Sequence, residues 1–219
     1  MTGRLVVITG TGTGIGKTHV AEALLLAWRQ CGFSAAGLKP LESGVDGASP
    51  SDSARLAAAS SFHVKPIYSL RTPVAPHLAA KQEGVVLRLG PVHASIEAAL
   101  ACADIALLEL PGGLFSPFTD DFLNADFAAA LRPHALLLVA PDRLGVLHDV
   151  ICAVRATAAF PVPIAGVLLV APPVADSSTG SNAFELKTRI LPPVLATVPR
   201  GSPADLALSL CDLAKALAR

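Results

Sequence analysis

Short, nearly continuous apolar runs alternate along this chain with longer segments that carry apolar residues at helical spacing. The apolar runs predict strands at residues 5–9, 35–39, 105–110, 135–140, 164–170 and 194–198. Runs without polar alternation are typical of strands that are buried on both faces of a parallel sheet. The segments between them predict helices at residues 17–30, 52–59, 91–103, 144–159, 182–190 and 204–217. This alternation favours one doubly wound α/β domain over residues 1–219, with a mostly parallel sheet and helices on both faces.

Composition narrows the classes of protein that the chain can represent. Its 219 residues are 52% hydrophobic and only 16% charged, which supplies a core and excludes a disordered chain. The formal net charge is zero, so we expect no nucleic-acid partner. The cysteines form no CxxC pair, which argues against a zinc or redox motif and favours reduced thiols in a cytoplasmic protein; they are Cys31, Cys102, Cys152 and Cys211.

Residues 158–175 form an apolar stretch without a charged side chain, long enough to raise the question of a membrane span. Four prolines fall inside it, and prolines at these positions would break a spanning helix. We therefore expect loop, strand and loop here, and no membrane partner.

The segment GTGTGIGKT at residues 10–18 follows a predicted strand and opens a predicted helix, which is the context that a phosphate-binding P-loop requires. Its backbone N–H groups would converge on phosphate oxygens at a helix N-terminus, from Gly12, Thr13, Gly14, Ile15 and Gly16. Lys17 would contact the β- and γ-phosphates, and Thr18 would place its hydroxyl on Mg²⁺. The chain is thus expected to be a P-loop NTPase-like α/β protein that uses ATP and Mg²⁺.

This loop departs from the common motif, because five residues rather than four separate Gly10 from Gly16. Read strictly, the first required glycine falls on Thr11. A glycine-rich turn with an incidental lysine is the alternative interpretation. A dinucleotide-binding fingerprint fits less well, because the G-x-G-x-x-G spacing is missing and Lys17 has no role in it.

Three further charged residues stand next to predicted strands or helices. Glu109 lies at the carboxyl end of the apolar run 105–110, so its carboxylate would enter the crevice at the carboxyl edge of the sheet; otherwise it faces solvent. Asp52 precedes a helical segment, where it either binds a metal or caps the helix. Lys39 ends the apolar run 35–39, which indicates an anion nearby unless its side chain extends to the surface.

Several segments together resemble the dethiobiotin synthetase family. The most specific are TGTGTGIGKT at residues 9–18 and KPLESG within residues 37–44. The others follow in the family's order, at residues 51–52, 72–77, 83–84, 109–113, 116–117 and 142–148. The resemblance covers most of residues 4–150.

The resemblance implies an ATP-dependent ligase of biotin synthesis that acts on 7,8-diaminononanoate, CO₂ and ATP. An amine takes up CO₂ as a carbamate, a carbamate oxygen attacks the γ-phosphate, and the second amine closes a cyclic urea and expels phosphate. In this family the active site lies at a homodimer interface, so a homodimer is implied as well.

The same resemblance assigns roles to individual residues. Lys17 would act on the transferring phosphoryl group, and Lys39 on the carbamate and the phosphoryl charge. The implied Mg²⁺ ligands are Thr18, Asp52 and Glu109. The implied contacts to the diamine or carbamate, besides Lys39, are Thr13, Ser43 and Gly112, with Thr13 also catalytic. Backbone donors for the substrate carboxylate of the neighbouring subunit are implied at Leu144, Gly145 and Val146.

Two departures from the family affect this interpretation. After Glu109 the family has Gly-Ala-Gly-Gly, whereas this chain has Leu110 and Pro111 before the two glycines, which stiffens and enlarges the turn. The family's adenine-reading asparagine is missing from residues 167–173. We therefore hypothesise relaxed discrimination between ATP and other triphosphates.

Three other functions are compatible with a P-loop. A ParA/MinD-like regulatory ATPase would usually carry an extra lysine where this chain has Gly12. An amide-forming ligase for corrinoid precursors would need a further glutamine-using domain, for which 219 residues leave no room. A nucleotide-binding module without chemistry would leave Lys39 unexplained.

Overall fold

A computed structural model describes residues 3–190 and 192–219. The strands are β1 (Arg4–Gly10), β2 (Ala35–Leu38), β3 (Leu41–Glu42), β4 (Tyr68–Ser69), β5 (Ile105–Glu109), β6 (Ala135–Pro141), β7 (Gly166–Val170) and β8 (Val194–Val198). The helices are α1 (Lys17–Gln30), α2 (Asp52–Ala59), α3 (Pro76–Glu83), α4 (Leu89–Cys102), α5 (Asn124–Leu131), α6 (Val146–Ala156), α7 (Asn182–Lys187), α8 (Pro203–Ser209) and α9 (Cys211–Leu217).

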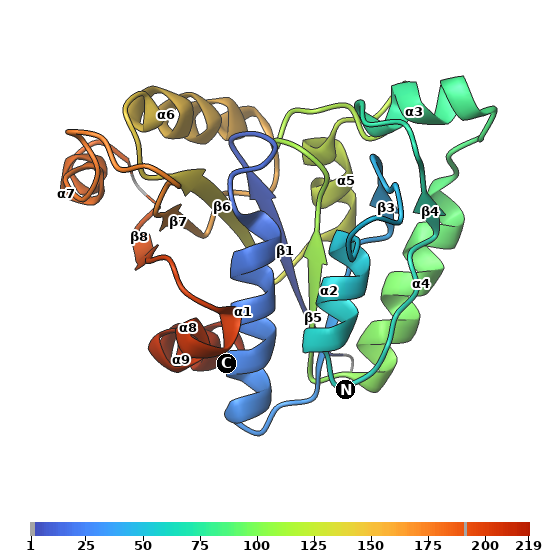
Figure 1. Cartoon of the computed structure of the whole chain (residues 1–219), viewed down its shortest axis with the longest axis horizontal. Helices are drawn as coiled ribbons and strands as arrows, with labels where there is room; N and C mark the ends of the chain where they lie inside the picture. The colour runs from blue at the N-terminus through green and yellow to red at the C-terminus, as the bar shows by residue number, and fades with distance from the viewer. Residues whose placement is uncertain (1–2, 191) are drawn as a thin grey trace.

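A six-stranded parallel sheet in the order β2-β5-β1-β6-β7-β8 forms the centre of the molecule (Figure 1). The predicted doubly wound α/β fold is therefore confirmed. All strands of this sheet point the same way, so their carboxyl ends lie along one edge. A second, two-stranded parallel sheet joins β3 to β4 beside that edge.

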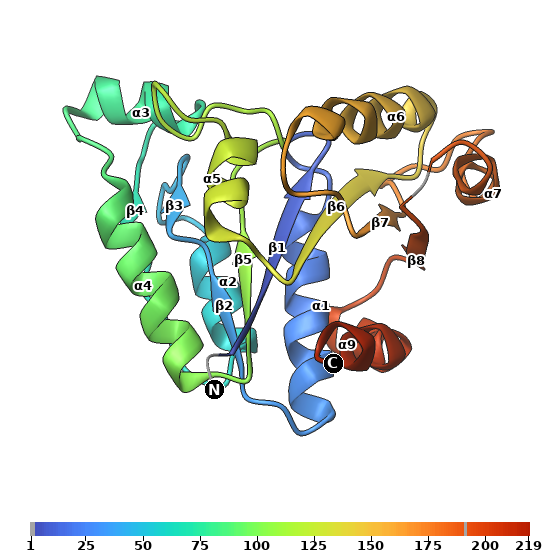
Figure 2. The ribbon, with the colours of Figure 1, turned by 180° about the vertical axis from the view of Figure 1, so that it is seen from behind.

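Two apolar layers cover the sheet, and the strands contribute to both because successive side chains point to opposite faces. In β1, Val6 and Ile8 pack with α1, α2, α8 and α9, in front of the sheet in Figure 1. Leu5 and Val7 pack with α4, α5 and α6 on the opposite face, seen in Figure 2. This two-sided burial explains why the strands read as continuous apolar runs.

Some predicted boundaries were wrong. The strand predicted at 164–170 begins at Gly166, and the helix predicted at 91–103 begins earlier, at Leu89. The helix predicted at 182–190 ends at Lys187. The segment predicted as one helix at 144–159 begins at Val146, and its last three residues form a 3₁₀ turn.

The segment 204–217 forms two helices rather than the one that was predicted. Leu210 lies between α8 and α9, with φ −98° and ψ 0°, and its side chain is buried. Both short helices pack against α1. The apolar spacing continues through the break, so the sequence pattern could not reveal it.

Four short elements were missed in the prediction: α3, α5, β3 and β4. Helix α3 begins with a proline and contains few apolar residues. Strands β3 and β4 have only two residues each. Such short elements give too little periodicity to be recognised. None of the described helices is both long enough and apolar enough to cross a membrane.

Trp28, the chain's one tryptophan, fixes α9 to α1. Its buried ring donates a hydrogen bond from Nε1 to the Ala214 carbonyl, 2.8 Å away. We predict that Trp28→Phe lowers the free energy of unfolding by about 1–3 kcal/mol, because the core loses this hydrogen bond and part of the ring's volume, although the Ala214 carbonyl keeps the Ala218 N–H as a donor. Urea unfolding followed by far-ultraviolet circular dichroism measures the change. Leu208→Ala, on the exposed face of α8, should stay within about 0.5 kcal/mol of the wild type; an equal loss in both variants would contradict this assignment.

Candidate active site

Strand register brings Lys39 and Glu109 together at the carboxyl edge of the sheet. Leu38, the last residue of β2, pairs with Leu108 of β5, so the next residues along the two strands are Lys39 and Glu109. Glu109 lies opposite Ile8 of β1, just before the P-loop. Because Ile8 packs on the α1 face and side chains alternate, Lys39 and Glu109 point toward the first turns of α1 and α2.

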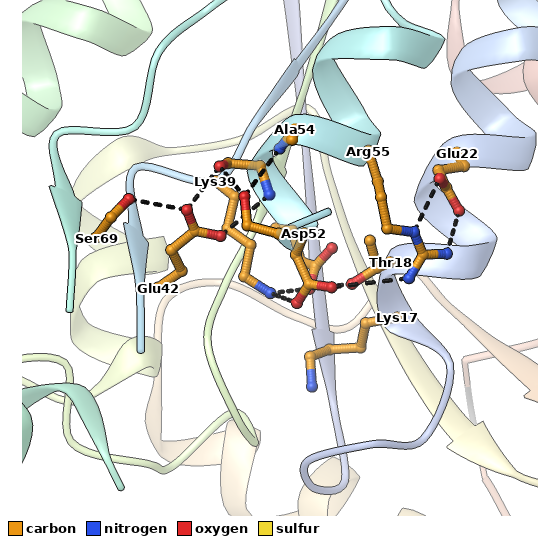
Figure 3. A network of polar contacts seen from close by, with 12 residues as sticks. Lys17, Thr18, Glu22, Lys39, Glu42, Asp52, Ala54, Arg55 and Ser69 are labelled. Carbon is orange, nitrogen blue, oxygen red and sulfur yellow. Dashed lines mark hydrogen bonds and ion pairs between the residues drawn. The ribbon is translucent and has the colours of Figure 1, made fainter. Parts of the chain in front are cut away.

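Lys39 is the centre of an ionic cluster at this edge (Figure 3). Its Nζ lies 2.6 Å from Glu109 Oε1 and also pairs with the carboxylate of Asp52. Thr18 Oγ1 donates to Glu109 Oε1 at 3.0 Å. Burial alone would lower the pKa of Lys39, but the two carboxylates outweigh it and raise the pKa. For Asp52, burial acts to raise the pKa, but Lys39 outweighs it and holds the pKa below its usual value. The ammonium and this carboxylate are therefore both charged at neutral pH.

The cluster decides between the alternatives that the sequence left open. Glu109 is 1% exposed, so it does not face solvent, and Lys39 at 8% does not extend to the surface. Ser51, not Asp52, caps α2, accepting a hydrogen bond from the Ala54 N–H. Asp52 is the first residue of the helix and is left to point at Lys39 (Figure 3).

The P-loop connects β1 to α1 with two residues in the left-handed region. Gly14 has φ 71° and Gly16, which precedes the helix, has φ 97°; a side chain at either position would be strained. Lys17 Nζ donates to the Gly12 carbonyl at 2.7 Å. Burial, with a contribution from the nearby Lys39, lowers the pKa of Lys17 to about 8. An anion bound in the loop would oppose that shift by favouring the charged ammonium.

The turn after Glu109 packs against the P-loop despite its departure from the family's sequence. A Cβ at Gly113 would lie 3.3 Å from the Gly10 carbonyl oxygen, and one at Gly112 would lie 3.7 Å from Thr13 Oγ1. Gly112 itself has φ 68°. The side chain of Leu110 is fully buried in the core, so the extra bulk points away from the P-loop.

Asn124 holds this turn, and the sequence analysis missed it. Its buried Nδ2 donates to the carbonyls of both Pro111 and Gly113, at 2.5 and 2.7 Å. These bonds fix the chain just beyond Glu109. No signal in the sequence identifies this role, because an asparagine at the start of a short helix is ordinarily a capping residue.

The arrangement of oxygen atoms fits a magnesium ion. Glu109 Oε2 is buried without a hydrogen-bond partner among the described residues. A hydroxyl and two carboxylates, on Thr18, Asp52 and Glu109, therefore meet at the end of the P-loop, and one carboxylate oxygen of Glu109 is left to bind a metal. Within residues 3–190 and 192–219 there is no group of three or more His, Cys, Asp or Glu side chains suited to a metal. Mg²⁺ does not need one, because it keeps waters and binds substrate phosphates.

A pocket of about 270 Å³ opens beside the P-loop where the family's adenine-reading residue would lie. Its wall includes residues 14–16, Pro172 and Pro173. The polar side chains along it are those of His19 and Arg200, and none of its lining residues carries a side-chain amide. Arg200 Nε donates to the Pro172 carbonyl at 3.0 Å, so part of its donor capacity is already used.

Four residues predicted to contact substrate make other contacts in this structure or lie elsewhere. The Ser43 hydroxyl donates to the Val74 carbonyl at 2.7 Å. The Leu144 N–H donates to Asp176 Oδ2 at 2.8 Å, and the remaining two, Gly145 and Val146, lie where α6 begins. Among the described residues no hydrogen bond joins the segment 144–146 to the Lys39 cluster.

The chain matches a family model described as an AAA domain over residues 4–205. It is 38% identical over 215 residues to the ATP-dependent dethiobiotin synthetase BioD of Aromatoleum aromaticum, covering 93% of this chain and 95% of that protein. It is 39% identical over 185 residues to the protein of the same name from Anaeromyxobacter dehalogenans, covering 82% of each. For that of Caulobacter vibrioides the identity is 37%, covering 94% of this chain and 96% of the relative.

Solved structures share the fold at low sequence identity. The cell division ATPase MinD of Pyrococcus furiosus superposes with a TM-score of 0.60 at 18% identity, covering 98% of this chain and 99% of that one. A ParA family ATPase from Chlorobium tepidum gives 0.58 at 15% identity, covering 99% and 96%. These likenesses show a P-loop NTPase fold and no more.

Asn124 allows a test of the turn after Glu109. We predict that Asn124→Ala lowers the free energy of unfolding by about 2–4 kcal/mol, since two carbonyls lose a shared buried donor. Asn124→Asp has nearly the same shape but cannot donate to either carbonyl when ionised, so it should be at least as unstable. Chemical denaturation measures both. A stable Asn124→Asp variant would contradict the role of the amide.

Proposed function

The chain belongs to the dethiobiotin synthetase family, and on that premise we propose that it converts 7,8-diaminononanoate, CO₂ and ATP into dethiobiotin, ADP and phosphate. The observation that carries the proposal is the buried Lys39 between Asp52 and Glu109, at the end of a P-loop. A fixed cation beside the phosphate site is what stabilisation of an anionic carbamate requires.

The proposed reaction begins when one amine of the substrate attacks CO₂ and forms a carbamate. A carbamate oxygen then attacks the γ-phosphorus of ATP, ADP leaves, and a carbamic–phosphoric anhydride results. The second amine attacks the carbonyl carbon, closes the cyclic urea and expels phosphate. No protein side chain forms a covalent bond to substrate, so catalysis consists of positioning and charge stabilisation.

The cluster residues have separate tasks in this scheme. The N–H groups of residues 12–16 and the ammonium of Lys17 would bind the phosphates. Thr18, Asp52 and Glu109 would hold Mg²⁺, which supplies charge neutralisation on the β- and γ-phosphates when bound. Lys39 would leave its two carboxylates in part and turn its ammonium toward the carbamate. Thr13 of the P-loop and Gly112 of the turn after Glu109 lie close to each other, and they would line the binding site of the reacting amine.

The substrate's own carboxylate would bind across a homodimer interface. We propose that the backbone donors at Leu144, Gly145 and Val146, at the start of α6, serve the neighbouring subunit's substrate. The Leu144 N–H already donates to a carboxylate, that of Asp176, which supports this choice of segment. Ser43 would contact the diamine after exchanging its bond to Val74.

Two lysine variants test the scheme. We predict that Lys17→Ala abolishes turnover, because it removes contacts to the phosphates that also stabilise the transition state. Lys39→Ala should bind ATP nearly as well as the wild type but lose dethiobiotin formation by a factor of 100 or more, on the order of 3 kcal/mol. Mass spectrometry of product formed from Mg·ATP, bicarbonate and 7,8-diaminononanoate, with calorimetry for ATP, gives both quantities.

Lys215→Ala, a lysine variant on α9, is the matched control and should behave like the wild type. Near-normal turnover in Lys17→Ala would refute the P-loop assignment. Loss of ATP binding in Lys39→Ala would refute the carbamate role. ATP hydrolysis by the wild type without dethiobiotin would favour a regulatory ATPase over the proposed ligase.

The pocket beside the P-loop generates a prediction about base selectivity. Since no side-chain amide or carboxylate lines it, the base would be recognised by backbone groups, by packing and by the side chains of His19 and Arg200. We predict that kcat/KM values for ATP, GTP and CTP fall within about 100-fold of one another, a range of ~2.7 kcal/mol. Steady-state kinetics with the three triphosphates measures this. A larger preference for ATP would show that the pocket discriminates by other means.

A further inference from the structure

Glu42 is a buried carboxylate beside the candidate active site that the proposed reaction does not use. It ends β3, is 4% exposed, and forms no ion pair within the described part of the chain. Its Oε1 accepts hydrogen bonds from the Ser53 hydroxyl at 2.6 Å and from the Ser69 hydroxyl at 2.9 Å. Its Oε2 accepts the backbone N–H of Ser53 at 3.1 Å. Figure 3 shows Glu42 between Ser69 and the first turn of α2.

These bonds join two parts of the chain that are far apart in sequence. Ser69 of β4 pairs directly with Glu42 in the small parallel sheet, so this side of the connection is fixed by backbone pairing. Ser53 is the second residue of α2, immediately after Asp52. Glu42 therefore attaches the N-terminus of α2 to the small sheet, three residues beyond Lys39.

Asp52 needs such an attachment more than the other cluster residues do. Glu109 is held by its strand and Thr18 by the 14-residue helix α1. Asp52 begins a helix of only eight residues, its side chain is 41% exposed, and the preceding residues 46–50 are exposed. Arg55, three residues further along α2, pairs with Glu22 of α1, so the very start of the helix depends on a contact of its own.

A carboxylate suits this position for an electrostatic reason. The first turn of a helix carries unpaired N–H groups and a partial positive charge, which favours an anion there. Charge-assisted hydrogen bonds are also stronger than neutral ones. A buried carboxylate without a cation is costly unless donors satisfy it, and Ser53 supplies two of the three. The energy of this arrangement thus depends on α2 keeping its place.

We propose that Glu42 is a positioning residue, which holds Asp52 at the metal site by binding the N–H and hydroxyl of Ser53. This inference rests on the proposed function only in taking Asp52 as a ligand of Mg²⁺. It predicts that weakening the Glu42–Ser53 contact lowers metal affinity, while the P-loop keeps its affinity for phosphates.

The test separates these two affinities. Calorimetry gives the Kd of the protein for the ATP analogue adenylyl-imidodiphosphate twice, once with Mn²⁺ in place of Mg²⁺ and once with EDTA. The Kd with EDTA divided by the Kd with Mn²⁺ gives the factor by which the metal strengthens binding. In Glu42→Gln, which keeps the shape but loses the charge and one acceptor, we expect the ratio to fall about tenfold, with the EDTA value unchanged within twofold.

Two serine variants complete the experiment. Ser53→Ala removes one bond on the α2 side and should lower the ratio about threefold. Ser69→Ala removes one bond of similar length on the strand side and should change the ratio by less than twofold, which makes it the matched control. Thermal melting of each variant identifies any that fails to fold, in which case Ser53→Ala still decides the question.

Three outcomes would overturn the inference: an unchanged ratio in Glu42→Gln and Ser53→Ala, an equal fall in both Kd values, or a wild-type protein without any metal contribution. The ratio does not depend on which substrate the enzyme turns over. If the wild type forms no dethiobiotin but the ratio still falls, the proposed function fails and the positioning role remains. If dethiobiotin forms and the ratio does not fall, the proposed function stands and the positioning role of Glu42 fails.

Discussion

A buried ammonium held by two carboxylates is the constraint on which this molecule depends. A lysine in a protein interior is tolerated only with anionic partners, and those partners are costly without it. Lys39, Asp52 and Glu109 come from three separate elements, so the cluster forms only when β2, β5 and α2 are correctly placed. Parallel register fixes two of them at one edge of the sheet, and the tether at Glu42 fixes the third. The same three groups then surround the end of the P-loop, where charge would develop during the proposed phosphoryl transfer.

Much of the fold was predictable because it depends on regular patterns. Strands buried on both faces give continuous apolar runs, and the six predicted strands are the six of the main sheet. The P-loop, with its glycines before Lys17 and Thr18, carries its own local signal. Even the meeting of Lys39 with Glu109 follows from the rule that parallel strands end at one edge. Asp52 was ambiguous, because an acidic residue before a helix is most often a cap, and here Ser51 took that role.

What could not be predicted depends on contacts between distant residues or on elements too short to show a period. Asn124 binds the turn after Glu109 across more than ten residues, and nothing in its neighbourhood distinguishes it from a capping residue. Glu42 in the sequence is simply an acidic residue before a loop; its burial arises from pairing β3 with β4, which have two residues each. The break at Leu210 is hidden because both short helices keep one apolar face toward α1. From the sequence, Leu110 was expected to enlarge the turn after Glu109. The structure buries the Leu110 side chain in the core instead, which no local pattern indicates.

The most direct test of the proposed reaction follows oxygen atoms through one turnover. We propose that the carbamate oxygen, the γ-phosphate and the ring-closing amine react in one site around Lys39, so the oxygen that attacks phosphorus must leave with it. With ¹⁸O-labelled CO₂, Mg·ATP and 7,8-diaminononanoate, rapid mass spectrometry should find one ¹⁸O in the phosphate and one in the cyclic urea for each dethiobiotin formed. Unlabelled phosphate, released with or without dethiobiotin, would contradict this reaction, because the γ-phosphate would then have been attacked by water.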